Sequence, residues 1–247
     1  NVNLSIELYG TEITFVDNVN RTDPNAPSFL LVPSYRKMAP PLPLTILVAA
    51  FFVVTAVAHL GNASLWRAYY EQQLALCRCP TRWVEYGVSA GIMITAIAIG
   101  VGVREYTLLF AIGRLIATTM SFGLLTEMHA IPASKDTWTT GFATRMAPHF
   151  MGYVPQVGAW LIIIVGFYDE TNPDGRAAPW FVHLIIWTEL AFFFSFGIVQ
   201  AVQQARPPSQ YWQGELMYQV LSLVAKGTLG IIVLANVLML SSLEEAF

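Results

Sequence analysis

Six long apolar runs constrain this chain of 247 residues more than any other feature of its sequence. A helix needs about 20 mostly apolar residues to cross a bilayer, and the stretch from Leu44 to Leu60 contains no Asp, Glu, Lys or Arg. The runs cover approximately residues 43–66, 82–104, 106–130, 147–168, 179–204 and 212–241. The sequence therefore predicts an all-α membrane protein embedded in a lipid bilayer, without the alternation of a β-barrel.

The composition agrees with this class and excludes several others. Hydrophobic residues make up 55% of the chain and charged residues 12%, whereas soluble domains carry about 25% charge. A net charge of −3 offers no basic surface for nucleic acid. Cys77 and Cys79 lie too close together to frame a disulfide-linked fold, and no His or Cys cluster has the spacing of a metal site.

Residues 1–42 form a separate segment before the bundle of residues 43–247. Apolar residues alternate with polar ones from Val2 to Leu8, and again at Ile13 and Phe15. This period of two predicts a small β-hairpin that turns near Gly10. A proline-rich approach to the first apolar run follows the predicted hairpin.

The distribution of cations predicts the orientation of the spans. Connections after the first, third and fifth runs hold six cations, whereas the opposite connections hold two. The six are Arg67, Arg78, Arg82, Lys135, Arg145 and Arg206, and the two are Arg104 and Arg176. The positive-inside rule places the cation-rich connections in the cytoplasm, so we expect the hairpin and the C-terminus to be extracellular.

Lys226 lies deep in the last apolar run, where a lysine costs about 2.5–3.5 kcal/mol on insertion scales. It is either a lysine neutralised by burial, or one kept for ion coupling or for covalent chemistry with an aldehyde. Ser222, Gln219 and Glu215 precede it on the same helix face. This polar stripe predicts a face turned to the bundle interior, although hydrogen bonds between helices would also explain it.

Other ionisable residues inside the runs are candidate partners of that lysine. Glu85 opens the second run with Ser89 one turn later, and Glu189 lies deep in the fifth run. Arg114 lies in the middle of the third run, and Glu189 is a candidate for the acid that neutralises it. His59 ends an apolar stretch, where a hydrogen-bonded structural role and a proton-carrying role are both open.

Aromatic residues gather in the fifth run, and Trp187 and Phe194 are among them. Most such residues pack against other helices or lipid. A subset of them would line the flat slot that a long conjugated ligand needs.

Four stretches of the sequence resemble the heliorhodopsin family. Residues 214–226 resemble its last helix with the retinal lysine, and residues 82–86, followed by Ser89 and Met93, resemble its third helix with the counterion. Residues 51–60, which include His59, are similar to its second helix, and residues 122–127 to the end of its fourth.

The resemblance implies a rhodopsin-like bundle of seven helices, of which this chain contains six spans, equivalent to helices B to G, so that the first precedes Asn1. It implies all-trans retinal joined to Lys226 through a protonated Schiff base, with Glu85 as counterion. Ser89 and Ser222 match its hydroxyl partners, and His59, Met93, Trp187 and Phe194 are further candidates near the chromophore. It also implies a homodimer in which the hairpin takes part.

Three functions remain open from the sequence. The first is a light receptor with a slow photocycle that signals to a cytoplasmic partner. The second is light-gated or light-driven proton conduction, for which the candidates are Glu189, Glu215, Arg114 and His59. The third is a small-solute transporter that couples ions through Lys226 and Glu85. An enzyme is not expected, because the sequence contains no nucleophile–base motif or phosphate-binding loop.

Overall fold

A computed structural model describes residues 5–18, 27–171 and 180–244 of the chain. Two strands precede the helices, β1 (Ser5–Asp17) and β2 (Phe29–Pro43). The helices are α1 (Leu44–Ala63), α2 (Arg67–Ala75), α3 (Pro80–Gly100), α4 (Tyr106–His129), α5 (Phe142–Thr171), α6 (Trp180–Ala205) and α7 (Tyr211–Glu244). A short 3₁₀ turn, Pro208–Gln210, joins α6 to α7.

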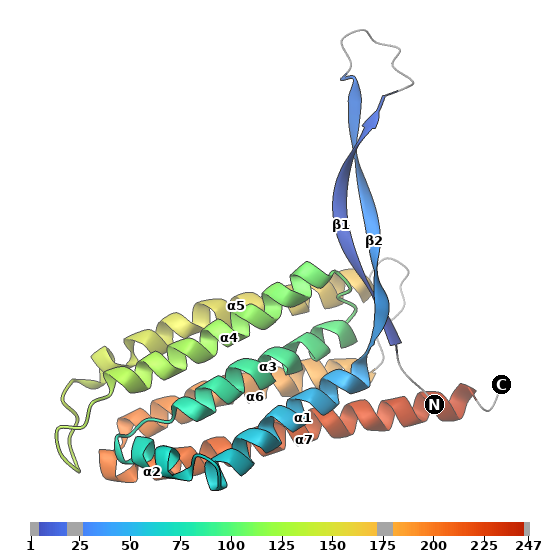
Figure 1. The fold of residues 1–247 in the computed structure, drawn as a ribbon. Helices are drawn as coiled ribbons and strands as arrows, with labels where there is room; N and C mark the ends of the chain where they lie inside the picture. The colour runs from blue at the N-terminus through green and yellow to red at the C-terminus, as the bar shows by residue number, and fades with distance from the viewer. Residues whose placement is uncertain (1–4, 19–26, 172–179, 245–247) are drawn as a thin grey trace.

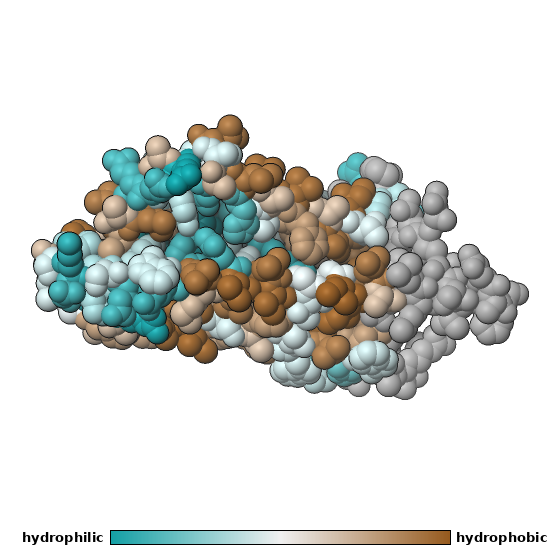
Figure 2. All heavy atoms as spheres, turned by 90° about the horizontal axis from the view of Figure 1, so that it is seen from below, coloured by the Kyte–Doolittle hydropathy of each residue, from teal (hydrophilic) through white to brown (hydrophobic). Residues whose placement is uncertain are grey.

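Within the described ranges, six helices are long and apolar enough to cross a membrane, and α2 is too short to do so. The prediction of six spans is therefore confirmed. The helices α5, α4, α3 and α1 lie side by side in that order, and α6 packs against α5, α3 and α7 (Figure 1). Apolar side chains cover much of the bundle, and polar ones gather towards the end that holds α2 (Figure 2). We call this end the α2 end and the opposite one the hairpin end.

The β-hairpin differs from its prediction in the position of the turn. β1 pairs with β2 in antiparallel register, with Gly10 opposite Arg36 and Ile13 opposite Pro33. The proline-rich approach is thus the second strand, and the predicted turn near Gly10 is wrong. A Cβ at Gly10 would overlap the ring of Tyr106 in α4. Glycine is needed there because the strand runs close to a helix, and not because the chain reverses.

The hairpin is fixed to the bundle at its base and projects across the direction of the helices (Figure 1). The Tyr9 N–H donates to the Arg104 carbonyl at 3.0 Å, beside an isolated parallel bridge between Tyr9 and Glu105. Ile6 and Leu8 are buried against the bundle, whereas Phe15 and Leu31 farther along the hairpin are exposed. The hairpin therefore presents apolar side chains outside the core of the described protein.

The helix α3 occupies the centre of the bundle and determines where the site lies. Its contact with α4 is close because Gly91 and Gly113 face one another, and a Cβ at Gly113 would lie 3.4 Å from the Gly91 carbonyl oxygen. Small residues let the backbones of membrane helices approach in this way. One further face of α3, which includes Glu85, Ser89 and Met93, is buried inside the bundle.

Candidate functional site

Lys226 is buried in the middle of α7, with 4% of its surface exposed. Its Nζ donates to Glu85 Oε1 at 2.8 Å and to Ser222 Oγ at 2.9 Å. Nζ also lies 5.2 Å from the centre of the Tyr86 ring. The structure thus brings together Lys226, Glu85 and Ser222 from two helices that are far apart in the sequence, and provides both an anion and an aromatic face for a positive charge.

Three donors converge on one oxygen of Glu85. Besides Lys226, the Ser89 hydroxyl donates to Oε1 at 2.7 Å and the Thr55 hydroxyl does so at 2.6 Å. Thr55 belongs to α1 and was not a sequence candidate, because a threonine in an apolar run resembles an ordinary packing residue. Together these donors stabilise the charged carboxylate and fix its position in the low-dielectric interior.

An apolar cavity opens beside Lys226. Its walls include Met93 and Ala90 from α3, Met120 from α4, and Phe193 from α6. The polar wall residues Tyr86, Ser89, Ser222 and Lys226 come from α3 and α7, the helices that supply the Lys226–Glu85 pair. The cavity therefore has a polar end at the lysine and an apolar remainder.

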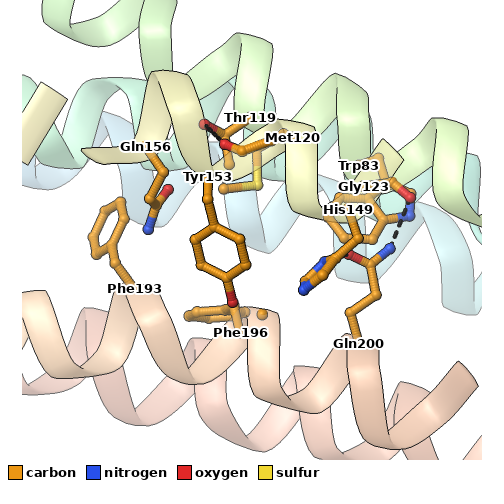
Figure 3. A pocket seen from close by; sticks show the side chains of 12 residues that line it. Trp83, Thr119, Met120, Gly123, His149, Tyr153, Gln156, Phe193, Phe196 and Gln200 are labelled. Atoms are coloured by element: carbon orange, nitrogen blue, oxygen red, sulfur yellow. Dashed lines mark hydrogen bonds between the residues drawn. The ribbon is translucent and has the colours of Figure 1, made fainter. Parts of the chain in front are cut away.

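A second cavity shares Met120, Phe193 and Phe196 with the first (Figure 3). Its walls contain more polar groups, of which His149 Nδ1 lies 2.8 Å from Gln200 Oε1. The Gln200 amide in turn donates to the Gly123 carbonyl at 2.8 Å. His149 was not a sequence candidate, and its spacing of four residues from Tyr153 is the signal that would have placed the two on one helix face.

A buried ionic cluster lies nearer the α2 end. Arg82 pairs with both Glu127 of α4 and Glu215 of α7, and its guanidinium lies 3.9 Å from the centre of the Tyr218 ring. Tyr211 donates its hydroxyl to Glu127 at 2.9 Å. Arg82 therefore belongs to α3 and is buried, so counting it among the loop cations was wrong. Glu215 is an internal ion-pair partner in the same cluster.

Three candidates face outwards instead of into the site. The side chains of His59, Arg114 and Trp187 are all exposed, and none of them lines either cavity of the site. Trp187 has 50% of its surface exposed, because the inward face of α6 is formed by Ile186, Glu189 and Phe193. In the described structure these three side chains point away from the site, and their roles near the chromophore or as an interior charge stay predictions.

Two further candidates are internal but outside the cavity walls. Phe194 is half-buried and stacks on Tyr153, with ring centres 5.8 Å apart, so it supports a wall from behind. Glu189 is completely buried, and neither of its carboxylate oxygens has a hydrogen-bond partner among the described residues. No ion pair joins it to the exposed Arg114 within the described parts of the chain.

This donor set fits an elongated, apolar aldehyde. A buried primary amine provides the nucleophile, and a carboxylate at 2.8 Å compensates the charge of a cation formed on that nitrogen. The remaining wall of the first cavity contains Ala90, Met93, Met120, Phe193 and Phe196, which suit a polyene. Retinal has both of these properties.

The comparisons with known proteins agree with this fit. No curated protein sequence matches the chain. The family model described as Heliorhodopsin matches residues 6–238. This match covers all but the first residue of the two strands, all six spans and every residue around Lys226. With an internal lysine–carboxylate pair beside an apolar slot, the chain is a retinal-binding, light-sensing membrane protein that belongs to the heliorhodopsin family.

Proposed function

We propose that this protein is a light receptor in which Lys226 binds all-trans retinal covalently and Glu85 serves as the counterion. The observation that supports this proposal most strongly is the 2.8 Å contact between Lys226 Nζ and Glu85 Oε1 at the polar end of an apolar cavity. Bound retinal would supply the absorption of visible light and a double bond that isomerises.

The protein's own residues would control the proton on Lys226 Nζ. Glu85 stabilises that proton by its charge, and Thr55 and Ser89 hold the carboxylate in place. Ser222 lies 2.9 Å from the same nitrogen and offers a second acceptor when the N–H turns away from Glu85. A change at this point can reach the α2 end through Tyr86, whose hydroxyl donates to the Tyr218 carbonyl at 3.0 Å beside Arg82.

The test is the visible spectrum of the apoprotein after all-trans retinal is added. We expect the wild type to form a visible band and Lys226→Ala to form none. Lys135→Ala is the matched control, because Lys135 is an exposed loop residue, and should keep the band. A visible band of full intensity in Lys226→Ala would overturn the proposal.

Glu85→Gln tests the role of the counterion separately from the linkage. Without a nearby anion, a charged nitrogen in the interior is unfavourable, so we expect the band at neutral pH to move into the near ultraviolet. Acidification should restore the visible band. A variant with the wild-type spectrum at neutral pH would show that Glu85 is not the counterion.

A second candidate function is light-gated proton conduction, and the burial of Glu189 favours it. A carboxyl group without partners among the described residues can accept and release a proton inside the membrane. We expect photocurrents in a voltage-clamped membrane under this alternative, and their loss in Glu189→Gln. If no current is seen at any voltage, proton conduction is excluded and the light-receptor function remains.

For the orientation, we propose that the α2 end faces the cytoplasm and would meet a signalling partner there. This is supported by Arg67, Arg78, Lys135 and Arg206, which all lie at this end. Protease cleavage in sealed vesicles of a site inserted beside Lys135 tests it. Cleavage only from the cytoplasmic side is expected, and cleavage only from the outside would reverse the assignment.

We further propose that the protein forms a homodimer through the hairpin. Its support is the exposure of Ile13, Phe15 and Leu31, which are between 61% and 70% exposed. Light scattering in detergent should give a dimer for the wild type and a monomer for the double variant Phe15→Ser, Leu31→Ser. Leu65→Ser, at a leucine of the α2 end that is 85% exposed, should stay dimeric.

A further inference from the structure

A second cavity lies next to the one beside Lys226. The two cavities share Met120, Phe193 and Phe196 in their walls, so an elongated ligand fixed at Lys226 that extends beyond these side chains would meet the second cavity. The two cavities differ in chemistry. The first is apolar beyond the lysine, whereas the second has polar side chains from α5 and α6 in its wall.

Gln156 is the polar side chain of that wall that lacks a partner for its carbonyl oxygen. It is 3% exposed, and its Oε1 has no hydrogen-bond partner among the described residues. Figure 3 shows its amide pointing into the space beside Phe193 and Tyr153. A buried acceptor without a partner is unfavourable, so a bound group that brings a donor to this point is preferred over one that does not.

Some neighbouring polar groups of the same wall are already paired, whereas the Trp83 indole N–H also has no hydrogen-bond partner among the described residues. His149 and Gln200 form a hydrogen bond at 2.8 Å, and the Thr119 hydroxyl donates to the Gly152 carbonyl at 3.2 Å. They leave the Gln156 oxygen unsatisfied. A group bound in the cavity can supply a donor to this oxygen.

We propose that Gln156 recognises a hydroxyl group on the ring of the chromophore, so that the protein prefers a ring-hydroxylated retinal to unmodified retinal. This inference rests on the proposed attachment at Lys226. The hydroxyl donates to Gln156 Oε1, whereas a hydrocarbon ring covers that oxygen and excludes water. A site that contains a hydrogen-bonding group discriminates strongly against the analogue that lacks the matching group.

The test is a competition for the apoprotein between equimolar all-trans retinal and its all-trans 3-hydroxy or 4-hydroxy derivative, with the bound chromophores extracted and quantified. The aldehyde and polyene are identical, so differences at Lys226 cancel. We expect at least one hydroxylated form to be enriched about tenfold over unmodified retinal at equilibrium, as one net hydrogen bond would give. Equal uptake of both forms, which a water held by Gln156 would produce, overturns the proposal.

Two variants test whether Gln156 causes the preference for ring-hydroxylated retinal. Gln156→Leu should bring the ratio to about one or below it, because the acceptor is gone. Gln204→Leu is the matched control, since Gln204 is a buried glutamine of α6 that lines neither cavity and also lacks side-chain partners among the described residues. It should keep the wild-type ratio. An unchanged ratio in Gln156→Leu would exclude Gln156 as the recognising residue.

The competition also separates this inference from the proposed function. If no retinal forms a visible pigment with the wild type, the attachment at Lys226 fails and the ring preference fails with it. If unmodified retinal forms a pigment in full yield and no hydroxylated form is enriched, only the ring preference fails.

Discussion

The hydroxyl of Thr55 is the contribution of α1 to the interior site. It donates to Glu85 Oε1 at 2.6 Å, the same oxygen that accepts from Lys226 and Ser89. A hydrogen bond to a charged group contributes about 1.5–3 kcal/mol. The negative charge next to Nζ therefore depends on a residue that carries no charge itself.

Thr55→Val should move the visible band of the pigment to shorter wavelength. Loss of a donor concentrates the charge on Glu85 and strengthens its attraction for the cation at Nζ. The matched control is Thr118→Val, because the exposed Thr118 bonds only its own helix at the Arg114 carbonyl. The absorption maxima of the two purified pigments are the measurement, and equal maxima would contradict the assigned role of Thr55.

For single residues, the sequence predicted how deep a side chain lies in the membrane better than it predicted which way the side chain points from its helix. Lys226 was predicted to face inwards because Ser222 and Glu215 share its face, and it does. Trp187 and Arg114 had no such companions and face outwards. Arg82 seemed to be a loop cation because it stands at the start of an apolar run, and only three-dimensional contact reveals its two carboxylate partners.

Helices α3 and α4 meet at glycines, and one of these contacts shapes the wall of the second cavity. A Cβ at Gly123 would overlap the ring of Trp83, which is itself buried. We expect Gly123→Ala to lower the free energy of unfolding by about 1–3 kcal/mol, as overpacking does. Gly87→Ala is the control, since nothing lies within 4 Å of its added Cβ. Thermal unfolding in detergent compares them, and equal midpoints would contradict the tight contact.

The start of α4 provides a prediction that depends on pH. Burial by itself would raise the pKa of Glu105, but hydrogen bonds from the Thr107 hydroxyl and the Leu108 N–H lower it overall. Because the pKa is lower in the folded protein, Glu105 stabilises the fold above its unfolded pKa of about 4.3, and this contribution disappears as the pH falls through the folded value.

Glu105→Gln should therefore be less stable than the wild type at neutral pH by about 0.3–1 kcal/mol, the usual worth of a partly exposed charge at a helix N-terminus. The difference should shrink as the pH falls below about 4.3 and vanish once the pH is below the folded pKa of Glu105. Unfolding midpoints measured across this pH range test it. A difference that stays constant down to low pH would show that the charge of Glu105 contributes nothing.

The elements themselves were largely predictable, and their exceptions have physical reasons. Six apolar runs gave six helices, because a span must satisfy its backbone internally. The turn of the hairpin was misplaced because glycine allows both a chain reversal and a close approach to another element. At Gly10 it allows the strand to lie close to the ring of Tyr106. The helix α2 is short and polar, so its composition did not distinguish it from a loop.

At the scale of the whole molecule, Arg82 links α3 and α7, the two helices that carry Glu85 and Lys226. It connects α3 to α4 through Glu127 and to α7 through Glu215. The backbone N–H of Cys79 adds the α2–α3 connection by donating to Glu127 at 2.8 Å. The helices that provide Glu85 and Lys226 are therefore also held together nearer the α2 end.

Arg82→Gln should destabilise the protein by about 3–5 kcal/mol, because it leaves buried carboxylates without their cation. The matched control is Arg67→Gln, whose partner Glu71 lies one turn away on the exposed α2, and it should unfold like the wild type. Both are measured by thermal unfolding of the purified protein. If Arg82→Gln and Arg67→Gln have the same midpoint, the cluster does not hold the helices together.

The attachment of the chromophore is tested most directly by reducing the pigment with borohydride and locating the retinyl group by peptide mass spectrometry. The chain offers three lysines, Lys37, Lys135 and Lys226, so every possible attachment point can be examined. We predict the retinyl group on Lys226 alone. A retinyl group on Lys37 or Lys135, or on no lysine in a sample with a fully developed visible band, would contradict the proposed site.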